Sequence, residues 1–347
     1  MSMMIFMNKK QHSLRSRWTC IAVLLCLIPL IFSGCVDQHP KNTKGNNTQT
    51  ESAETMIEIT DPEEKAAVEA AKVKTAAMSG EPRIIATSPA VAEICDKLDL
   101  DLAGVCKSSV STIPKRYKKV KKVGTAMSPD MEIVASLNPD WILSPSSLQS
   151  DLEAKYKNLQ TDWAFLNLKS VPGMYRSIQE LGEIFNRKEQ AQKMADDFTS
   201  FYKKFKKRNK SKKQPKVLIL MGLPGSYVIA TENSYVGSLV KMAGGKNVYQ
   251  NTGEEFLNVN TENMKKKEPD IILRAAHALP DQVVKMFKED FETNDIWKHF
   301  EAVEKGKVYD LTYQYFGMSA NFQYPKALSE LEELFYQKKS TGGEKGK

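Results

Sequence analysis

The sequence predicts an α/β protein, and three observations support this class. From Arg83 onward, short apolar runs such as residues 84–86 alternate with segments of helical pattern, as is typical of parallel sheets covered by helices. The same alternation begins again after Pro215. Between the two stretches, apolar residues recur at three- and four-residue spacing, which indicates amphipathic helix. We therefore expect two Rossmann-like lobes with central β-sheets, joined by one long α-helix, with a ligand cleft between the lobes.

The N-terminal lobe is expected to span residues 83–172. Strands are predicted at residues 84–86, 102–106, 141–143 and 165–168. A helix through Lys97 should follow the first strand, because Ser88 and Pro89 supply an N-cap and a first-turn proline.

Residues 173–213 form the predicted connecting segment, which precedes a C-terminal lobe over residues 214–338 and a polar tail over residues 339–347. The helical pattern breaks near Asn186 and then runs from Arg187 to Arg208. A helix of about 22 residues is roughly 33 Å long, enough to brace two lobes. Such a connector predicts limited hinge motion on ligand binding.

Two pairs of similar segments indicate an internal duplication. Residues 85–87 and 229–231 both read Ile-Ala-Thr and precede a helical pattern. The segment SPDMEIVASLNPDWIL, from Ser128, aligns with NTENMKKKEPDIIL, from Asn260. In this second pair, Glu132 and Glu262 each lie eight residues before the Asp of a Pro-Asp that begins an apolar strand.

The N-terminus has the pattern of a lipoprotein signal peptide. Residues 1–17 contain four basic residues and no acid, an apolar run follows, and Ser33-Gly34-Cys35 resembles a lipobox. We expect a signal peptide over residues 1–34 and lipidation at Cys35. Residues 35–82 are predicted to be a flexible tether, in which residues 62–78 have a helix-forming composition. The lobes should therefore be held at the lipid bilayer, on the outer face of the cell membrane.

Charge and cysteine content argue against a nucleic-acid-binding protein and against a disulfide-stabilised one. Residues 1–35 hold four of the 50 basic residues and none of the 42 acidic ones, which leaves a net charge of +4 for the rest. No basic block alternates with aromatic residues, so nucleic acid is not an expected partner. Only Cys95 and Cys106 follow Cys35. A disulfide framework is not expected, although one disulfide between these two stays possible.

His277 is the main candidate ligand residue. It follows the apolar run 271–273, and only it and His299 lie in the part of the chain that should fold. In the first lobe, the candidate is Met127 in Gly124-Thr-Ala-Met-Ser-Pro. A histidine nitrogen and a methionine sulfur facing each other suit the two axial positions of haem iron. Without a CxxCH motif any haem is not covalently attached. Met318 is the rival methionine.

The rest of a haem pocket would be aromatic or aliphatic, with donors at one rim. Backbone amides at the predicted helix start can bind a propionate. Aromatic residues beyond residue 310 can supply a wall. The predicted pocket residues are Thr87, Ser88, Pro89, Ala90, Arg274, Tyr313, Tyr315, Phe316 and Met318.

Three segments carry a family resemblance: KVLILMGLPGSYVIATENSYVG, EPDIILRAAHALP and FKEDFETNDIWKHFEAV. They resemble the haem-binding lipoproteins of Gram-positive iron acquisition. More broadly, residues 83–335 resemble the periplasmic-binding-protein superfamily with a rigid helical backbone, which serves siderophore and vitamin B12 importers.

The resemblance implies a substrate-binding protein of an ABC importer, and not an enzyme. It implies that Met127 and His277 bind haem iron from opposite lobes. It also implies that Glu132 and Glu262 contact arginines of a permease dimer. The expected partners are the ABC permease with its ATPase and upstream cell-surface haem-binding proteins, and the chain should be a monomer.

Three alternatives stay open at this point. A siderophore or cobalamin carrier of the same fold would need cationic or aromatic cleft residues in place of the axial pair. A zinc or manganese carrier is disfavoured because such sites use several histidine and carboxylate ligands. A chelatase or haem-processing enzyme would need an open iron site or an acid–base pair, and no catalytic motif is evident.

Overall fold

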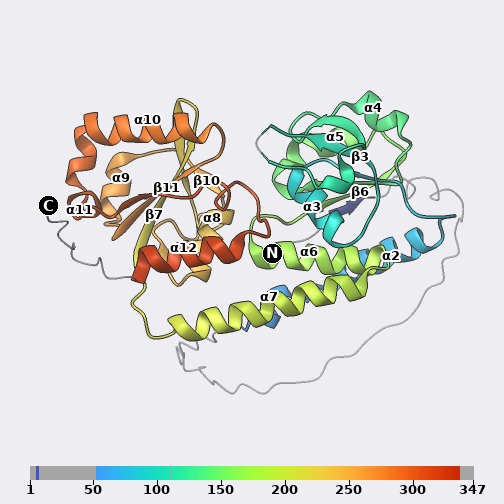
Figure 1. Cartoon of the computed structure of the whole chain (residues 1–347), viewed down its shortest axis with the longest axis horizontal. Coiled ribbons are helices and arrows are strands. Elements are labelled where there is room, and N and C mark those ends of the chain that lie inside the picture. The colour runs from blue at the N-terminus through green and yellow to red at the C-terminus, as the bar shows by residue number, and fades with distance from the viewer. Residues whose placement is uncertain (1–4, 8–51, 110, 337–347) are drawn as a thin grey trace, which may run out of the picture.

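The computed structural model describes residues 5–7, 52–109 and 111–336. Two α/β lobes lie side by side, and a layer of helices runs beneath both of them (Figure 1). The predicted fold class is therefore confirmed. Cys35 and most of the predicted signal peptide lie outside the described residues. No helix in the described ranges is long and apolar enough to cross a bilayer.

The N-terminal lobe contains a six-stranded sheet in the order β1-β6-β5-β2-β3-β4. Its last five strands are parallel, and β1 pairs antiparallel with β6 at one edge. All four predicted strands are present, and β1 and β4 are additional. The strands are β1 (Ile5–Met7), β2 (Ile84–Ala86), β3 (Leu102–Lys107), β4 (Lys121–Thr125), β5 (Trp141–Pro145) and β6 (Asp162–Leu166). The helices are α3 (Pro89–Lys97), η2 (Lys115–Tyr117), α4 (Met131–Ser136), η3 (Ser146–Leu148) and α5 (Gln149–Tyr156).

The C-terminal lobe has a mixed sheet in the order β10-β8-β7-β11-β12, with β9 also paired to β7. Strands β7, β11 and β12 are parallel, whereas β8 is antiparallel to β7. The antiparallel pair arises from a tight turn at Pro224-Gly225, where Gly225 has φ +82°. The strands are β7 (Lys216–Leu223), β8 (Ser226–Ala230), β9 (Lys246–Asn247), β10 (Phe256–Leu257), β11 (Ile271–Ala276) and β12 (Val308–Asp310). The helices are α8 (Tyr235–Met242), α9 (Thr261–Lys266), α10 (Pro280–Thr293), η4 (Asp295–His299), α11 (Glu301–Glu304) and α12 (Tyr324–Tyr336).

The duplication inferred around the two Pro-Asp dipeptides is present in three dimensions. Asp140 accepts a hydrogen bond from the backbone N–H of Arg83 at 2.8 Å, and Asp270 accepts the same bond from Lys216 at 2.7 Å. In each lobe this carboxylate ties the start of one strand to its parallel neighbour. The other match, between residues 85–87 and 229–231, does not join equivalent strands. By its pairing β2 corresponds to β7, whereas residues 229–230 lie on antiparallel β8.

The connecting segment consists of two packed helices, α6 (Val171–Ile184) and α7 (Lys188–Asn209). The predicted break is confirmed at Asn186, which has φ +54° and so turns the chain between them. Helix α7 has the predicted 22 residues. Figure 1 shows it running lengthwise beneath the lobes.

The prediction of a flexible tether is wrong for its C-terminal part. Residues after 51 form α1 (Ala53–Ile57) and α2 (Pro62–Ala76), which pack against α6. The side chains of Arg176 and Gln179 on α6 donate hydrogen bonds to the carbonyls of Met56 and Ile57, at 3.2 and 2.8 Å. The apolar face of α2 is small, but α6 offers a complementary surface that no local sequence pattern reveals.

Two buried carboxyl groups meet where α2 packs on α6. Glu64 and Glu180 are 2% and 1% exposed. Burial, together with the nearby Glu64 carboxyl, raises the pKa of Glu180 to about 9. Glu180 is therefore protonated at neutral pH.

The lobes and the helical layer share one hydrophobic core, which includes residues from α3, α6, α7, α8 and α12. Tyr175 of α6 stacks on Phe198 of α7 with ring centroids 4.6 Å apart, and its hydroxyl lies 3.2 Å from that of Tyr324 on α12. The backbone N–H of Ala320 also donates to the carbonyl of Leu168 at 2.8 Å. These contacts restrict movement between the lobes.

The two cysteines of the described body do not pair. Cys95 and Cys106 are both buried and free. Burial raises the pKa of Cys95 to about 12 and that of Cys106 to about 11, so neither is a reactive thiolate at neutral pH.

Candidate functional site

Met127 lies on a tight loop beyond the carboxyl end of β4. The loop closes when the N–H of Asp130 donates to the carbonyl of Val123 at 2.7 Å. Gly124 has φ +96°, and a Cβ there would lie 2.7 Å from the carbonyl oxygen of Ser128. Only glycine allows this closure. The Met127 side chain is 70% exposed, so its sulfur is presented to solvent and not packed in the core.

His277 lies at the equivalent edge of the other sheet, directly after β11. Its backbone N–H donates to the carbonyl of Gly222 on β7 at 2.9 Å, which fixes where the side chain leaves the sheet. Partial burial lowers the pKa of His277 below its ordinary value. The imidazole is therefore neutral at physiological pH, which is the form that binds a metal.

Leu279, two residues further on, was not predicted as a site residue. It has φ +45° and ψ +60° at the N-cap of α10 and is 50% exposed. Left-handed backbone costs a branched residue about 1–3 kcal/mol. A helix start favours Ser, Thr, Asp or Asn. An exposed leucine at a strained helix start breaks two local rules at once, and such departures are expected at functional or strained sites.

The N-terminal sheet has its topological switch point between β2 and β5, where ligands of open α/β sheets usually bind. The hydroxyl of Thr87 donates to the carbonyl of Leu143 at 3.2 Å and lies 2.8 Å from that of Ser144. Ser88 caps α3 by accepting from the N–H of Val91 at 3.2 Å. Both predicted side chains thus have structural partners. Pro89 and Ala90 form the first turn of α3 behind this cap.

Ser146 is a second residue that the sequence did not identify. Its hydroxyl oxygen lies just after β5, is inaccessible to solvent, and has no hydrogen-bond partner within the described residues. A ligand group at the switch point would provide one. A serine after a Ser-Pro pair carries no distinctive sequence signal.

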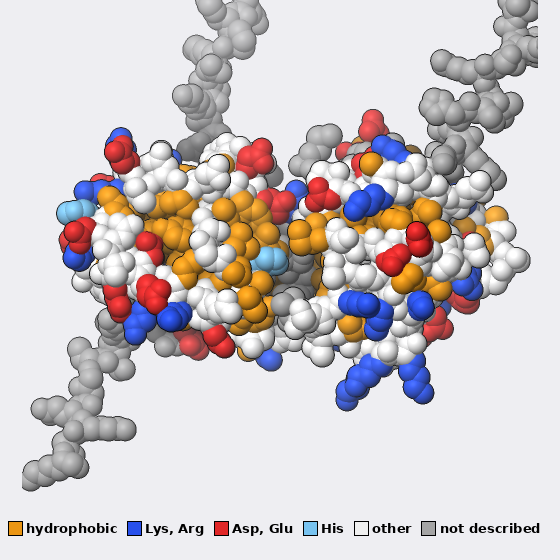
Figure 2. Space-filling model, turned by 90° about the horizontal axis from the view of Figure 1, so that it is seen from above, with side chains coloured by type: hydrophobic (Ala, Val, Ile, Leu, Met, Phe, Trp, Pro, Cys, Tyr) orange, Lys and Arg blue, Asp and Glu red, His pale blue; other side chains and the backbone are white. Residues whose placement is uncertain are grey.

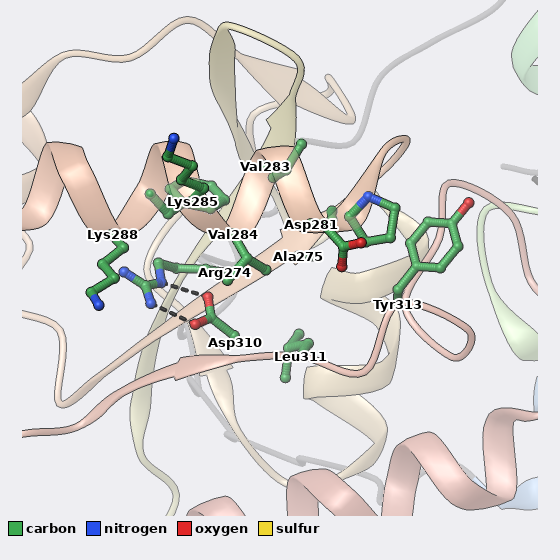
Figure 3. Close-up of a pocket in the computed structure, with 13 residues that line it drawn as sticks. Arg274, Ala275, Asp281, Val283, Val284, Lys285, Lys288, Asp310, Leu311 and Tyr313 are labelled. Carbon is green, nitrogen blue, oxygen red and sulfur yellow. Dashed lines mark hydrogen bonds and ion pairs between the residues drawn. The ribbon is translucent and has the colours of Figure 1, made fainter.

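A pocket of about 420 Å³ borders the His277 loop on the C-terminal lobe. It lies between α10 and the ends of β11 and β12 (Figure 3). Arg274 holds Asp310 through two hydrogen bonds of 2.7 and 2.6 Å and lies over the ring of Phe291 at 4.8 Å. Two of its nitrogens are therefore already engaged. Tyr313 lines the same pocket and lies to the right of Asp281 in Figure 3.

The other predicted wall residues lie at different depths. The prediction that Phe316 lines the pocket is wrong. Its side chain is fully buried in the shared core, where a ligand cannot contact it. Tyr315 and Met318 are partly buried and pack against the same core. Met318 therefore differs from Met127, whose side chain has few neighbours in the fold.

Helices α4 and α10, which follow the carboxyl ends of β4 and β11 along the chain, lie on the upper side of the molecule in Figure 1. Seen from above, hydrophobic side chains gather on the facing parts of both lobes, with a hollow between them (Figure 2). Within the described ranges, no group of three or more His, Cys, Asp or Glu side chains could hold a metal ion. This arrangement suits a mainly apolar ligand bound by one residue from each lobe.

Glu132 and Glu262 occupy matching positions on the two lobes. Each lies in the first turn of a six-residue helix, α4 or α9, capped by Asp130 or Asn260 respectively. Both side chains are exposed, and neither forms an ion pair with another described residue. They are paired acidic positions available to a partner.

Two α/β lobes on a shared layer of helices have the architecture of a bilobal binding protein. The sequence model of the periplasmic binding proteins matches residues 84–315, and the chain belongs to this family.

Relatives of known name point to one branch of the family. The high-affinity heme uptake system protein IsdE of Staphylococcus aureus (strain Newman) is 46% identical over 262 residues, which cover 75% of this chain and 89% of that protein. The crystal structure of S. aureus IsdE complexed with heme is 45% identical with a TM-score of 0.70, and covers 74% of this chain and 100% of that one. An ABC transporter substrate-binding protein from Listeria monocytogenes EGD-e is 48% identical with a TM-score of 0.70, covering 74% and 99%. The family resemblance seen in the motifs is confirmed.

Proposed function

We propose that this chain is the substrate-binding protein of an ABC importer that takes up haem as an iron source. The observation that carries the proposal is the similarity to IsdE over 262 residues, including a structure complexed with heme. The chain binds haem between its lobes and delivers it to the permease and its ATPase. It carries its ligand without chemical change, so it is not an enzyme.

Haem iron is held by Met127 and His277 in this proposal. A solvent-exposed methionine and a neutral histidine at the ends of opposing sheets support it. With both axial positions filled, the iron has no open site for oxygen chemistry. Backbone N–H groups in the first turn of α3 are proposed to bind a propionate.

The direct test is an absorption spectrum of the purified protein with haem. Six-coordinate low-spin iron at a stoichiometry of one is expected. No change in the haem spectrum on mixing, together with binding of a siderophore or cobalamin, would contradict the choice of ligand.

Met127→Ala is expected to weaken haem binding about tenfold or more and to convert the iron to high spin, because one axial ligand is lost. The matched control is Met318→Ala, which removes a methionine packed against the core and should leave the spectrum unchanged. Titration of each variant with haem measures both effects. A spectral change in Met318→Ala alone would show that the other methionine is the ligand.

Glu132 and Glu262 dock the protein on the permease in this proposal, each lobe contacting one subunit. Their matching places and their exposure support it.

The double variant Glu132→Lys/Glu262→Lys is expected to bind haem normally and to abolish haem-dependent growth, since like charges would then face the permease. The control Asp151→Lys/Glu289→Lys makes the same change of charge, one residue in each lobe, at exposed positions elsewhere. Loss of haem binding in the first double variant would place these glutamates in the pocket instead.

The remaining parts of the proposal concern location. Signal peptidase removes residues 1–34, and strand β1 with them, and lipidated Cys35 holds the monomer on the outer face of the cell membrane of a Gram-positive bacterium. Cell-surface haem-binding proteins supply the haem there.

A further inference from the structure

The C-terminal end of α7 and the residues after it carry a long run of positive charge. Eight of the eleven residues from Lys203 to Lys213 are Lys or Arg. We call the exposed ones the basic α7 surface: Lys203, Lys204, Lys207, Arg208, Lys210, Lys212 and Lys213.

Nearby acids neutralise only part of this surface. Lys203 pairs with Glu54, while Arg208 and Lys212 share Glu332. The other four lysines form no ion pair with any described residue. An uncompensated cluster of this kind attracts an anionic surface.

The chain enters the folded body beside this same surface. Glu54, the partner of Lys203, lies in the first turn of α1, two residues after Ser52. Hydrogen bonds from α6 hold α1 in place. The sixteen residues between Cys35 and Ser52 can span at most about 60 Å. Whatever holds Cys35 is therefore reached by a chain that leaves the folded body beside the basic α7 surface.

The position of this surface is opposite to that of the site. In Figure 1, α7 lies along the lower side of the molecule, whereas α10 and α4 lie on the upper side. A flat partner that contacts α7 would leave the upper side, with Met127 and His277, uncovered.

From these observations we propose that the basic α7 surface rests on the anionic lipid headgroups of the bilayer that anchors the chain, so that the haem site faces away from the membrane. This inference rests on the lipid anchor of the proposed function. It assigns the chain two orientations: one lying on the bilayer and open to a haem donor, and one turned over and docked on the permease.

The test uses the lipidated protein in vesicles, with a dye at Ser211→Cys and an energy-transfer acceptor on the lipid headgroups. Because Cys95 and Cys106 are buried, the new cysteine is labelled selectively. Strong transfer is expected in vesicles with about one-third phosphatidylglycerol, and weak transfer in phosphatidylcholine alone or at 1 M salt. A dye at Ser150→Cys, an exposed position on α5 of the N-terminal lobe, should show weaker energy transfer in the anionic vesicles than in phosphatidylcholine alone.

A charge-reversal variant tests the residues themselves. Each lysine strengthens contact with an anionic bilayer about fivefold, so Lys204→Glu/Lys207→Glu/Lys210→Glu should weaken it about a hundredfold or more. The control Lys118→Glu/Lys119→Glu/Lys155→Glu changes the net charge equally, at exposed lysines of the N-terminal lobe. Haem spectra of both variants check that they fold.

Equal transfer from Ser211→Cys in anionic and neutral vesicles, or equal effects of the two triple variants, would overturn the proposal. Failure of the lipid anchor is a separate result: the wild-type chain would not float with phosphatidylcholine vesicles. A chain that does not bind haem is a third result, and the absorption spectrum detects it independently of the vesicle experiments.

Discussion

His277→Ala is expected to weaken haem binding at least about 100-fold and to convert the bound iron from low spin to high spin. The imidazole is the stronger of the two proposed axial ligands, and β7 and β11 fix its position through the bond between His277 and Gly222. Substitutions that only disturb a metal ligand typically cost 10–100-fold in affinity, so loss of the ligand should cost at least as much.

The control is His299→Ala, which removes the other histidine of the described body. His299 is exposed on η4, away from the strand ends, and its loss should leave haem binding intact. Haem titration followed by absorption separates the two variants. A low-spin spectrum retained in His277→Ala would contradict the assignment.

The pH dependence of haem binding gives a further check on His277. Its pKa is lowered by burial, so the neutral ligand form persists through pH 7 and protons compete with iron only below the ordinary pKa of about 6.5. Affinity should therefore be constant above that pH and fall on acidification.

Glu180→Gln is expected to remove a loss of stability that the wild-type protein shows as pH rises. The unfolded chain releases the Glu180 proton near pH 4.5, whereas the folded chain keeps it up to about pH 9. The folded state thus binds more protons in this window, and the free energy of unfolding falls by up to about 1.4 kcal/mol per pH unit. Glutamine has the same size and cannot ionise.

Urea unfolding at pH 6 and pH 8.5 measures this difference. Relative to wild type, Glu180→Gln should gain about 3 kcal/mol between the two pH values. Glu183→Gln, one turn further along α6, is the control: hydrogen bonding to Lys188 lowers the pKa of Glu183, so its contribution is the same at both pH values. Parallel pH curves for wild type and Glu180→Gln would show that the Glu180 carboxyl is not protonated in the folded protein.

Much of the architecture could be predicted because its signals are local. Buried parallel strands are short apolar runs, and the break at Asn186 lies where the periodicity fails. Met127 and His277 could be placed because both follow strands, and strand ends meet at one edge of a sheet. The docking of α2 could not be predicted, since its alanine-rich face is specified only by the matching surface of α6. The burial of Phe316 likewise depends on how a loop packs against distant helices.

The shared core between the lobes has a consequence for the kinetics of ligand exchange. A protein whose lobes swing closed spends part of its binding free energy on that movement, and its ligand leaves only after reopening. Here α6, α7 and α12 are joined through Tyr175, Phe198 and Tyr324, so the two lobes are already held in place before a ligand arrives. Entry should then be limited by encounter and orientation. Release should be governed by the bonds to the iron, which a partner protein can exchange one at a time.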